Sequence, residues 1–388
     1  MKPTIHLYNN IASHYTEPLM LRLLESEFFD LKFSTGENKE WDIATIDFSK
    51  ENFSSLHEKL GSVNNIWIKG KYLFWQQGVL SRCLFGKKVD LIILLGEFAI
   101  LSNWLGALAC RLRGIPVAFR GHGLYGNEGP FKLFVRKTYY RLANMHMLYE
   151  RRSKQLMIKE GFIAEKIHVV FNSLDYDYHK SQREKFKMVP KSEAFDFFDH
   201  PEYQTLLFIG RLTKIKRLHY LIETAERINE NSAIKVNLLI IGDGSEKESL
   251  EKLASKKLDK GNYHFFGSCY DESIICKLLS KADLCVSPGN VGLTCIHSLS
   301  MGTPVCTHNN FNNQMPEVEA IEDGKTGVFF EENNKEDMYL KTKGWLEKNQ
   351  VKSNDIINDC YEIIDKYYNP FFQEKVYARV VQQKEPIV

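Results

Sequence analysis

The stretch IGRLTKIKRLHYLI at 209–222 carries two cations at a place where an anion can bind. Arg211 and Lys216 lie on a turn between an apolar run and an amphipathic helical pattern. A helix N-terminus favours an anion, and to it Arg adds a planar donor fork and Lys a point charge. The pattern therefore predicts a clamp for phosphate or diphosphate. A solvated basic loop is the alternative, because two neighbouring residues are also basic.

A second loop-to-helix junction occurs in SPGNVGLTCIHSLSMGTPV at 287–305. Gly289 and Gly292 allow backbone to approach a ligand closely, Thr294 lies near the helix start, and His297 lies one turn further in. A glycine and a proline then end the helix. The junction again aims backbone N–H groups at an anion.

The sequence gives little support for a nicotinamide-cofactor site, a metal site or a serine-hydrolase site. The strand-to-helix turn IIGDGSEKESL at 240–250 is not G-x-G-x-x-G, because Lys247 occupies the third glycine position, so a nicotinamide cofactor is not indicated. No His, Cys and carboxylate spacing suggests a zinc or iron site, and no G-x-S-x-G occurs. We therefore expect no cofactor and no metal. The D-x-D at Asp175 and Asp177 matches metal-dependent sugar transferases of another fold, but we interpret it as an ordinary loop.

The elements that must position these motifs alternate between short apolar runs and amphipathic stretches. Continuous apolar strands between amphipathic helices predict parallel sheets covered on both faces. The expected strands are 4–9, 65–70, 91–96, 115–121 and 166–173 in the first half, and 205–210, 236–242, 263–267 and 283–288 in the second. Between the halves, 177–204 is charged and aperiodic with two prolines, which predicts an interdomain linker. Ligands of such sheets bind beyond the carboxyl ends of the strands, so we expect the site in a cleft between two domains.

Composition sets further bounds. The chain has 388 residues, 44% of them hydrophobic, which fits two domains, and its formal net charge of +2 does not imply a nucleic-acid partner. No apolar run could span a bilayer, and MKPTIHLYNN has no signal-peptide hydrophobic region, so we expect a cytoplasmic protein. The eight cysteines form no C-x-x-C pair, which indicates free thiols in the core.

In order and spacing, these motifs resemble the family 4 retaining glycosyltransferases, which have the GT-B fold: two Rossmann-like domains that face each other across a cleft. The resemblance runs through GRLTKIKRLHYLI, IIGDG, FFGS, KADLCVSP and GLTCIHSLSMGTPV to GKTGVFF, and more loosely through IPVAFRGHGLYG and HVVFNSLD. It implies an acceptor-side domain at 1–176, the linker at 177–204 and a nucleotide-sugar domain at 205–365. A C-terminal helix within 366–388 is expected to pack back on the first domain.

The resemblance also assigns roles to single residues. It makes Arg211 and Lys216 the pair that holds the donor diphosphate, and His122 a cleft histidine on the donor sugar. His297 takes the place of a glutamate that holds the nucleotide ribose. The remaining donor contacts would come from Asn290, Val291, Gly292, Leu293 and Thr294, and the acceptor side from His14 and Tyr15, for which ordinary loop positions are the alternative.

The sequence departs from the family pattern at two positions. Gly289 stands where the first of two paired glutamates is usual, and His297 where the second is usual. The first glutamate meets the hydroxyls of the donor sugar, so the pattern does not specify the sugar. A neutral imidazole can still accept a hydrogen bond from a ribose hydroxyl. The glycine-rich loop near the N-terminus is also absent.

The resemblance implies metal-independent, retaining transfer of a sugar from a nucleotide-diphosphate sugar to a glycan or lipid-linked acceptor in surface polysaccharide synthesis. Arg211, Lys216 and the helix dipole would stabilise the leaving diphosphate in place of a metal ion. Two other hypotheses remain open. One is a non-catalytic scaffold, motivated by the missing glutamates, and the other is a nucleotide-sugar epimerase on the same fold.

The segment 131–159 is basic and aromatic. It is either a solvated helix face or a surface that touches anionic lipid and brings a cytoplasmic enzyme to the inner membrane face. Charge reversal at Arg136 and Lys137 would test the second interpretation. The basic residues of the segment are Lys132, Arg136, Lys137, Arg141, Arg151, Arg152, Lys154 and Lys159.

Overall fold

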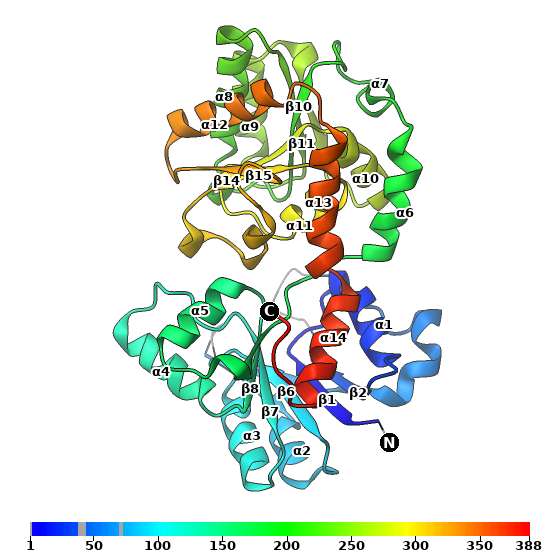
Figure 1. The fold of residues 1–388 in the computed structure, drawn as a ribbon, viewed down its shortest axis with the longest axis vertical. Helices are drawn as coiled ribbons and strands as arrows, with labels where there is room; N and C mark the ends of the chain where they lie inside the picture. Colours follow the sequence, from blue (N-terminus) through cyan, green and yellow to red (C-terminus); the bar gives the residue numbers. More distant parts are fainter. Residues whose placement is uncertain (1, 38–43, 70–72) are drawn as a thin grey trace. The chain divides into compact units, whose positions relative to one another are not determined.

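The computed structural model describes residues 2–37, 44–69 and 73–388. The chain forms two compact units (Figure 1). Unit 1 comprises Met1–Asp175 and Tyr368–Val388, and unit 2 comprises Tyr176–Tyr367.

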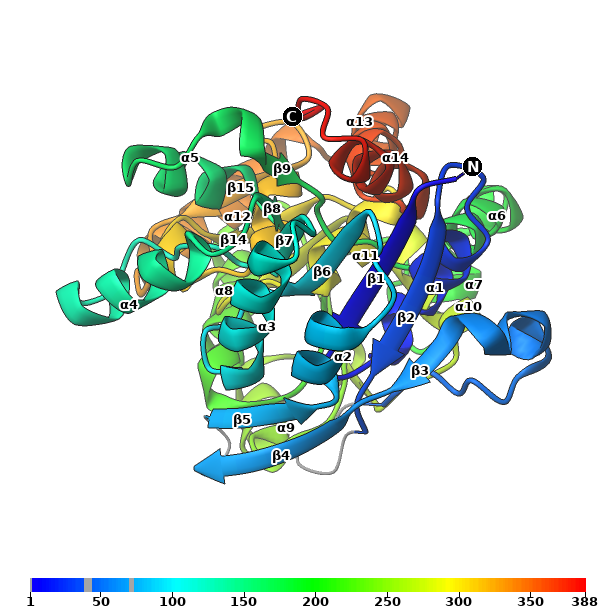
Figure 2. The same ribbon diagram turned by 90° about the horizontal axis from the view of Figure 1, so that it is seen from below.

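Unit 1 is built on a parallel sheet of seven strands among its described residues, in the order β3-β2-β1-β6-β7-β8-β9. Its central strands are largely apolar and are buried on both faces, as is typical of parallel strands covered by helices. Figure 2 shows α2 and α3 over one face of this sheet. The strands are β1 (Thr4–Asn9), β2 (Asp30–Thr35), β3 (Leu60–Ser62), β6 (Leu91–Leu95), β7 (Val117–Gly121), β8 (Met145–Leu148) and β9 (Ile167–Val169). The helices are α1 (Glu17–Leu24), α2 (Val79–Phe85), α3 (Leu101–Leu112), α4 (Pro130–Tyr140), α5 (Arg151–Lys159) and α14 (Pro370–Val381).

The expected strand at 65–70 is the main difference from the sequence prediction in unit 1. Its Gly70 lies outside the described residues, and the rest is β4 (Asn64–Lys69), which pairs antiparallel with β5 (Leu73–Gln77) in a separate two-stranded sheet. The side chains of Ile66 and Ile68 are 44% and 56% exposed. The apolar run alone could not distinguish this edge ribbon from a buried strand.

Unit 2, which is described along its whole length, has a parallel sheet of six strands in the order β12-β11-β10-β13-β14-β15. Numbered within the unit, this is the 3-2-1-4-5-6 order of the Rossmann fold. The strands are β10 (Gln204–Ile209), β11 (Val236–Ile241), β12 (Tyr263–Gly267), β13 (Leu284–Ser287), β14 (Val305–His308) and β15 (Gly327–Phe330). The helices are α6 (Tyr176–Lys187), α7 (Lys191–Ala194), α8 (Leu218–Asn231), α9 (Lys247–Lys257), α10 (Glu272–Lys281), α11 (Leu293–Ser300), α12 (Lys335–Lys348) and α13 (Asn354–Tyr367).

The core of unit 2 explains why its strands read as unbroken apolar runs. Leu206 and Phe208 of β10 pack with Leu238 of β11 and with the apolar face of α8, whose Leu221 and Ile222 are fully buried. Strand and helix thus bury the same apolar set, which supplies most of the favourable free energy of folding.

The predicted linker at 177–204 is structured rather than irregular. It contains α6 and α7 and belongs to unit 2, where Arg183 donates to the backbone oxygen of Ser300 and pairs with Asp365 at 2.8 Å. The sequence looked aperiodic because polar side chains such as Arg183 and His179 are buried through specific partners, so hydropathy does not mark the inner face of α6.

The helix near the C-terminus is α14, which is part of unit 1. Its Gln373 accepts a hydrogen bond from Ser173 and donates one to the backbone oxygen of Phe171, and its Glu374 pairs with Arg22 of α1 at 2.7 Å. The segment Tyr368–Val388 therefore belongs to the same unit as the first strands of the sheet.

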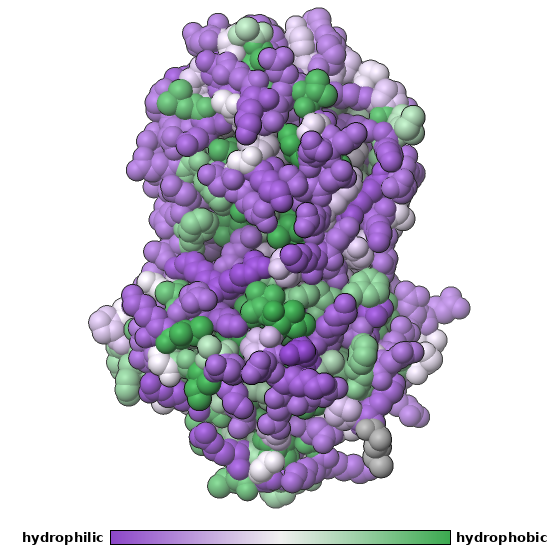
Figure 3. All heavy atoms as spheres, in the orientation of Figure 1, coloured by the Kyte–Doolittle hydropathy of each residue, from purple (hydrophilic) through white to green (hydrophobic). Residues whose placement is uncertain are grey.

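The two Rossmann-like units confirm the GT-B fold expected from the sequence. The predicted cleft between them stays a prediction. Among the described residues, no helix is both long and apolar enough to cross a membrane. The face drawn in Figure 3 is mainly hydrophilic, with hydrophobic residues scattered over it. All eight cysteines lie in the described part of the chain and are free thiols; seven are buried, as predicted, whereas Cys269 is partly exposed.

Candidate functional site

The site in unit 2 lies where the strand order reverses, between β10 and β13. These two strands are hydrogen-bonded neighbours, yet their chain continues to opposite sides of the sheet. The loops that follow them therefore leave from the same place at the carboxyl edge of the sheet, where open α/β sheets bind ligands. They are the two motifs that the sequence singled out, 210–217 and 288–292.

Lys216 joins these two loops. Its ammonium Nζ donates to the backbone oxygen of Asn290 at 2.6 Å and to the Asn290 Oδ1 at 2.9 Å. The backbone N–H of Gly289 in turn donates to the Lys216 carbonyl at 3.1 Å. Burial lowers the pKa of Lys216 below its ordinary value. The result is a half-buried cation fixed between two loops at the switch point.

Arg211 directly follows the close contact that shapes the first loop. A side chain at Gly242, after β11, would place its Cβ 1.9 Å from the Gly210 oxygen, so only glycine allows the two strand ends to meet. Gly242 has φ 142°, which also favours glycine. Arg211 is exposed at the turn that follows. Arg217, at the start of α8, pairs instead with Glu332 at 3.3 Å.

Hydrogen bonds to neighbouring elements hold the second loop, 288–292, in place. Gln314 accepts a hydrogen bond from the Val291 N–H at 2.8 Å and donates to Thr307 on β14. Val291 is fully buried, and Thr294 uses its hydroxyl to bond the Ile209 carbonyl at the end of β10. The Thr294 hydroxyl is therefore engaged in holding α11 against β10. Gly292 and Leu293 open α11, so the loop presents its backbone to the switch point.

The structure explains why a glutamate is missing at position 289. A Cβ built on Gly289 would lie 2.2 Å from the Ile215 backbone oxygen and 2.9 Å from the Lys216 Cα. Backbone cannot yield as the end of a flexible side chain can. The Gly289 backbone instead lies directly against the loop that carries Lys216.

The sequence assigned His297 to a nucleotide ribose, and the structure shows that it already has an acidic neighbour. Its Nε2 lies 2.8 Å from Oε1 of Glu272, the first residue of α10. The same Oε1 is 2.7 Å from Nε2 of His179 on α6, and the two imidazoles stack with centroids 4.9 Å apart. Burial acts to raise the pKa of Glu272, but the two imidazoles outweigh it and hold the pKa below its ordinary value. The carboxylate of Glu272 on α10 thus lies in the region where the resemblance expects a glutamate on α11.

Sequence reasoning missed Glu272 and His179. Both lie far from the motif in the chain, at 93 residues from each other, and His179 falls in the stretch interpreted as a linker. The only available signal was the position of Glu272, which opens a helix directly after the loop that follows β12, at the ligand-binding edge of the sheet.

In unit 1, His122 directly follows β7 at the carboxyl edge of the sheet. Its ring packs beside Tyr125 and Tyr149, and its backbone oxygen accepts a hydrogen bond from Ser153. Burial, helped by the positive charge of Arg136, lowers the pKa of His122 to about 4. Its Nδ1 is buried and has no hydrogen-bond partner among the described residues. His122 is therefore a neutral imidazole at neutral pH with a free polar atom.

The candidate acceptor residues lie at the corresponding switch point of unit 1, after β1. His14 packs against Tyr15 at 5.9 Å between ring centroids, and its backbone N–H donates to the Ala44 carbonyl. Glu97, which follows the neighbouring strand β6, also lies at this edge of the sheet and was not singled out from the sequence. The structure assigns neither His14 nor Tyr15 to a ligand, so their role stays a prediction.

The basic segment 131–159 is less available than its sequence suggests. Arg136 is buried with a side-chain exposure of 4% and donates to the Gly123 carbonyl, and Lys137 pairs with Glu160 at 2.6 Å. Charge reversal at these two residues would therefore disturb internal contacts of unit 1, and contact of the segment with anionic lipid stays a prediction. Lys132 is exposed on α4, and so are Phe131 and Phe134, at 81% and 67%.

Comparisons with known proteins find a family profile that matches unit 2 and solved structures with a similar fold. Residues 191–362, most of unit 2, match the sequence profile of the family described as glycosyl transferases group 1. An uncharacterized glycosyltransferase of Methanocaldococcus jannaschii is 28% identical over 147 residues, which is 36% of this chain and 36% of that protein. The match thus spans about a third of the length of that relative.

Solved structures match over nearly the whole chain. HepE of Anabaena, determined in complex with UDP, is 15% identical with a TM-score of 0.66, covering 98% of this chain and 100% of that one. A protein of Listeria monocytogenes described as a putative UDP-N-acetylglucosamine 2-epimerase is 15% identical with a TM-score of 0.60, covering 100% of both chains. At these identities, the likeness concerns the fold.

Proposed function

We propose that the protein is a glycosyltransferase that takes its sugar from a nucleotide-diphosphate sugar bound at the switch point of unit 2. The observation that carries the proposal is the position of Lys216, a half-buried ammonium held by Asn290 between the loops after β10 and β13. The group 1 profile covers the same unit, and the similarly folded HepE binds UDP.

The proposed chemistry is electrostatic. As the bond between the sugar and the diphosphate breaks, negative charge grows on the leaving phosphate. Lys216 and the backbone N–H groups at the start of α11 are held in place before the reaction, so they would stabilise that charge without reorganising, and Arg211 would add a second positive charge. The donor loop 289–294 would hold the sugar and phosphates with its backbone, since its side chains Val291 and Thr294 serve the packing.

His122 would bind the donor sugar as a neutral hydrogen-bonding group. An imidazole whose pKa is about 4 does not carry a proton at pH 7, so it can accept from a sugar hydroxyl but cannot act as a cationic acid. Retention of the anomeric configuration, metal independence, and a glycan or lipid-linked acceptor in surface polysaccharide synthesis belong to this proposal. They rest on the resemblance of the motifs.

Nucleotide binding is tested by thermal-shift titration of the whole protein with UDP, GDP, dTDP and CMP. A ligand at 100 times its dissociation constant adds about 2.7 kcal/mol of stability. We expect one nucleotide to stabilise the protein and Lys216→Ala to lose that response. The matched control is Lys214→Ala, an exposed lysine of the same turn, which should keep it. No response to any nucleotide would favour the non-catalytic scaffold.

An epimerase is the second candidate, because a putative UDP-N-acetylglucosamine 2-epimerase shares the fold over the full chain. The two reactions differ in what they need. An epimerase converts the nucleotide sugar without an acceptor, whereas a transferase turns over in proportion to acceptor. Incubation of the donor alone, followed by chromatography of the sugar, separates them. An isomerised sugar in the absence of acceptor would replace the transferase proposal.

A further inference from the structure

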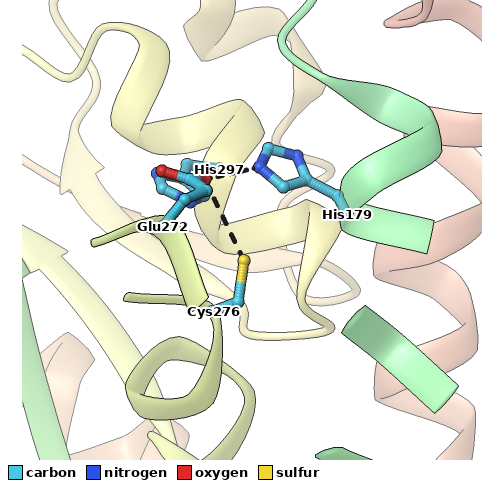
Figure 4. A group of neighbouring side chains, drawn as sticks. All are labelled: His179, Glu272, Cys276 and His297. Carbon is cyan, nitrogen blue, oxygen red and sulfur yellow. Dashed lines mark hydrogen bonds and ion pairs between the residues drawn. The ribbon is translucent and has the colours of Figure 1, made fainter. Parts of the chain in front are cut away.

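Three helices of unit 2 bring together four side chains that sequence spacing did not connect. They are His179 from α6, Glu272 and Cys276 from α10, and His297 from α11 (Figure 4). The two α10 residues are four apart, so they lie on the same face of that helix. One ligand atom of each residue lies within 4.8 Å of all the others.

We propose that these four residues, which we call the α6-α10-α11 cluster, bind a zinc-class divalent cation. The donors are two imidazoles, one carboxylate and one thiol, which is the ligand chemistry of tetrahedral zinc. The thiol and imidazoles select against magnesium and calcium, which prefer oxygen donors. A thiolate and a carboxylate together also neutralise the charge of a divalent ion.

The distances are close to those that a cation requires. In tetrahedral coordination with bonds of about 2.0–2.3 Å, neighbouring ligand atoms lie about 3.3–3.8 Å apart. The Glu272 Oε1 is now 2.7 and 2.8 Å from the two imidazole nitrogens, and 3.9 Å from the Cys276 sulfur. The carboxylate thus has to move outward by about half an ångström from each imidazole, within the reach of a side-chain rotation.

Two further observations point to a ligand inside the cluster. Although the Nε2 of His297 lies near the carboxylate, it is buried and has no aligned hydrogen-bond partner among the described residues. A metal would satisfy it. The Glu272 side chain is 40% exposed, whereas that of His179 is 2% exposed. A cation could therefore reach the cluster from solvent past the Glu272 side chain, whereas His179 and His297 are largely enclosed. A metal site needs such an entry path.

The cation would have a consequence for the donor site. It would fix α11, whose first residues Leu293 and Thr294 belong to the donor loop, to α6 and α10. It would also occupy the His297 nitrogen that the resemblance assigned to a ribose. The cluster is thus expected to couple cation binding to nucleotide binding, while its ability to bind a cation does not depend on the proposed function.

Cobalt(II) titration of the whole metal-free protein tests the proposal, because a thiolate bound to tetrahedral cobalt gives a near-ultraviolet charge-transfer band and visible bands. We expect one equivalent of cobalt to bind with both features and to be displaced by zinc. Cys276→Ser should remove the charge-transfer band, and His179→Ala should weaken binding by more than about 100-fold. Cys269→Ser is the matched control, because this half-exposed thiol lies outside the cluster and its loss should change nothing.

Glu272→Gln keeps the shape of the carboxylate and guards against a variant that merely unfolds. It should fold, as judged by circular dichroism, and bind cobalt more weakly. Absence of the charge-transfer band in the natural protein, or its loss in Cys269→Ser alone, would overturn the proposal. The nucleotide titration is run separately with chelator and with zinc. Nucleotide binding without cobalt binding would reject only the cluster, and the reverse would reject only the proposed function.

Discussion

The ammonium of Lys216 donates to both the backbone and the side-chain oxygen of Asn290, and so ties together two loops that are 74 residues apart in the chain. The pair lies at the point where the strand order of unit 2 reverses. Because the lysine is partly buried, its charge is screened less than that of a surface lysine. The predictions below test what this arrangement and its neighbours contribute.

Asn290→Asp should weaken binding of nucleoside diphosphate by about 10-fold or more, since a tenfold loss needs only about 1.4 kcal/mol. The new carboxylate would face the Lys216 ammonium, neutralise it and repel the diphosphate. Isothermal titration with the nucleotide that stabilises the natural protein measures the effect. Asn231→Asp, the same change of charge at the end of α8, should leave affinity unaltered. Equal affinity in both variants would mean that Asn290 does not lie at the diphosphate.

Restoring the family glutamate with Gly289→Glu should not restore a family-type site. The new Cβ would meet the Ile215 backbone oxygen at 2.2 Å, so the two loops would be forced apart. We expect a loss of about 1–3 kcal/mol in the free energy of unfolding, measured by urea denaturation, together with weaker nucleotide binding. Gly292→Ala is the control for the stability measurement alone, because a Cβ there meets only the Met315 side chain at 3.7 Å. A variant of natural stability would show that the loop moves freely.

Unit 1 should lose stability in mild acid because of its buried histidines. Burial lowers the pKa to about 4 for His122 and His168 and to about 3 for His146. The unfolded chain takes up these protons near the ordinary value of 6.5, and the folded chain only near pH 4. The stabilisation is therefore complete above pH 6.5 and falls by about 1.4 kcal/mol per histidine for each pH unit below it.

Denaturation at several pH values between 7 and 4 measures this slope. His146 has aromatic neighbours that include Tyr140 and Phe162, so His146→Phe should be tolerated. It should reduce the slope of unfolding free energy against pH by the contribution of one histidine, about 1.4 kcal/mol per pH unit. His57→Gln, at an exposed histidine of the same unit, should leave it unchanged. An unchanged slope in the His146 variant would contradict the assignment of the acid sensitivity to buried imidazoles.

If the acceptor is lipid-linked, α4 is the surface to test for membrane contact. Phe131 and Phe134 are exposed on this helix, and burying each in a bilayer interface is worth about 1.5–3 kcal/mol. The double change to alanine should reduce flotation with anionic phosphatidylglycerol vesicles by 10-fold or more for each phenylalanine. Phe85→Ala, an equally exposed phenylalanine on α2, serves as the control. Equal flotation of all three proteins would remove α4 as the contact surface.

The sequence by itself determined the class of the fold and the first half of the donor site. Unbroken apolar runs such as those of β10 and β11 bury both faces of a strand, so they predict parallel sheets without knowledge of the partners. The glycine, Arg211 and Lys216 at the end of β10 predict an anion-binding turn for the same reason, because strand end, turn and helix start are local features of the chain.

Only the tertiary structure decided which distant residues meet. Hydropathy cannot show whether the β4 segment forms a buried strand of the main sheet or a strand of the two-stranded sheet with β5, because the strand that it pairs with is set by contacts distant in the chain. It also cannot show that Arg136 is buried or that His179 belongs to a helix packed against α10, because buried polar side chains are defined by partners rather than by period. Strand order placed Asn290 against Lys216, and three helices placed Glu272 between two histidines. These are long-range contacts, and a sequence pattern specifies the surfaces that can meet but not the pairs that do.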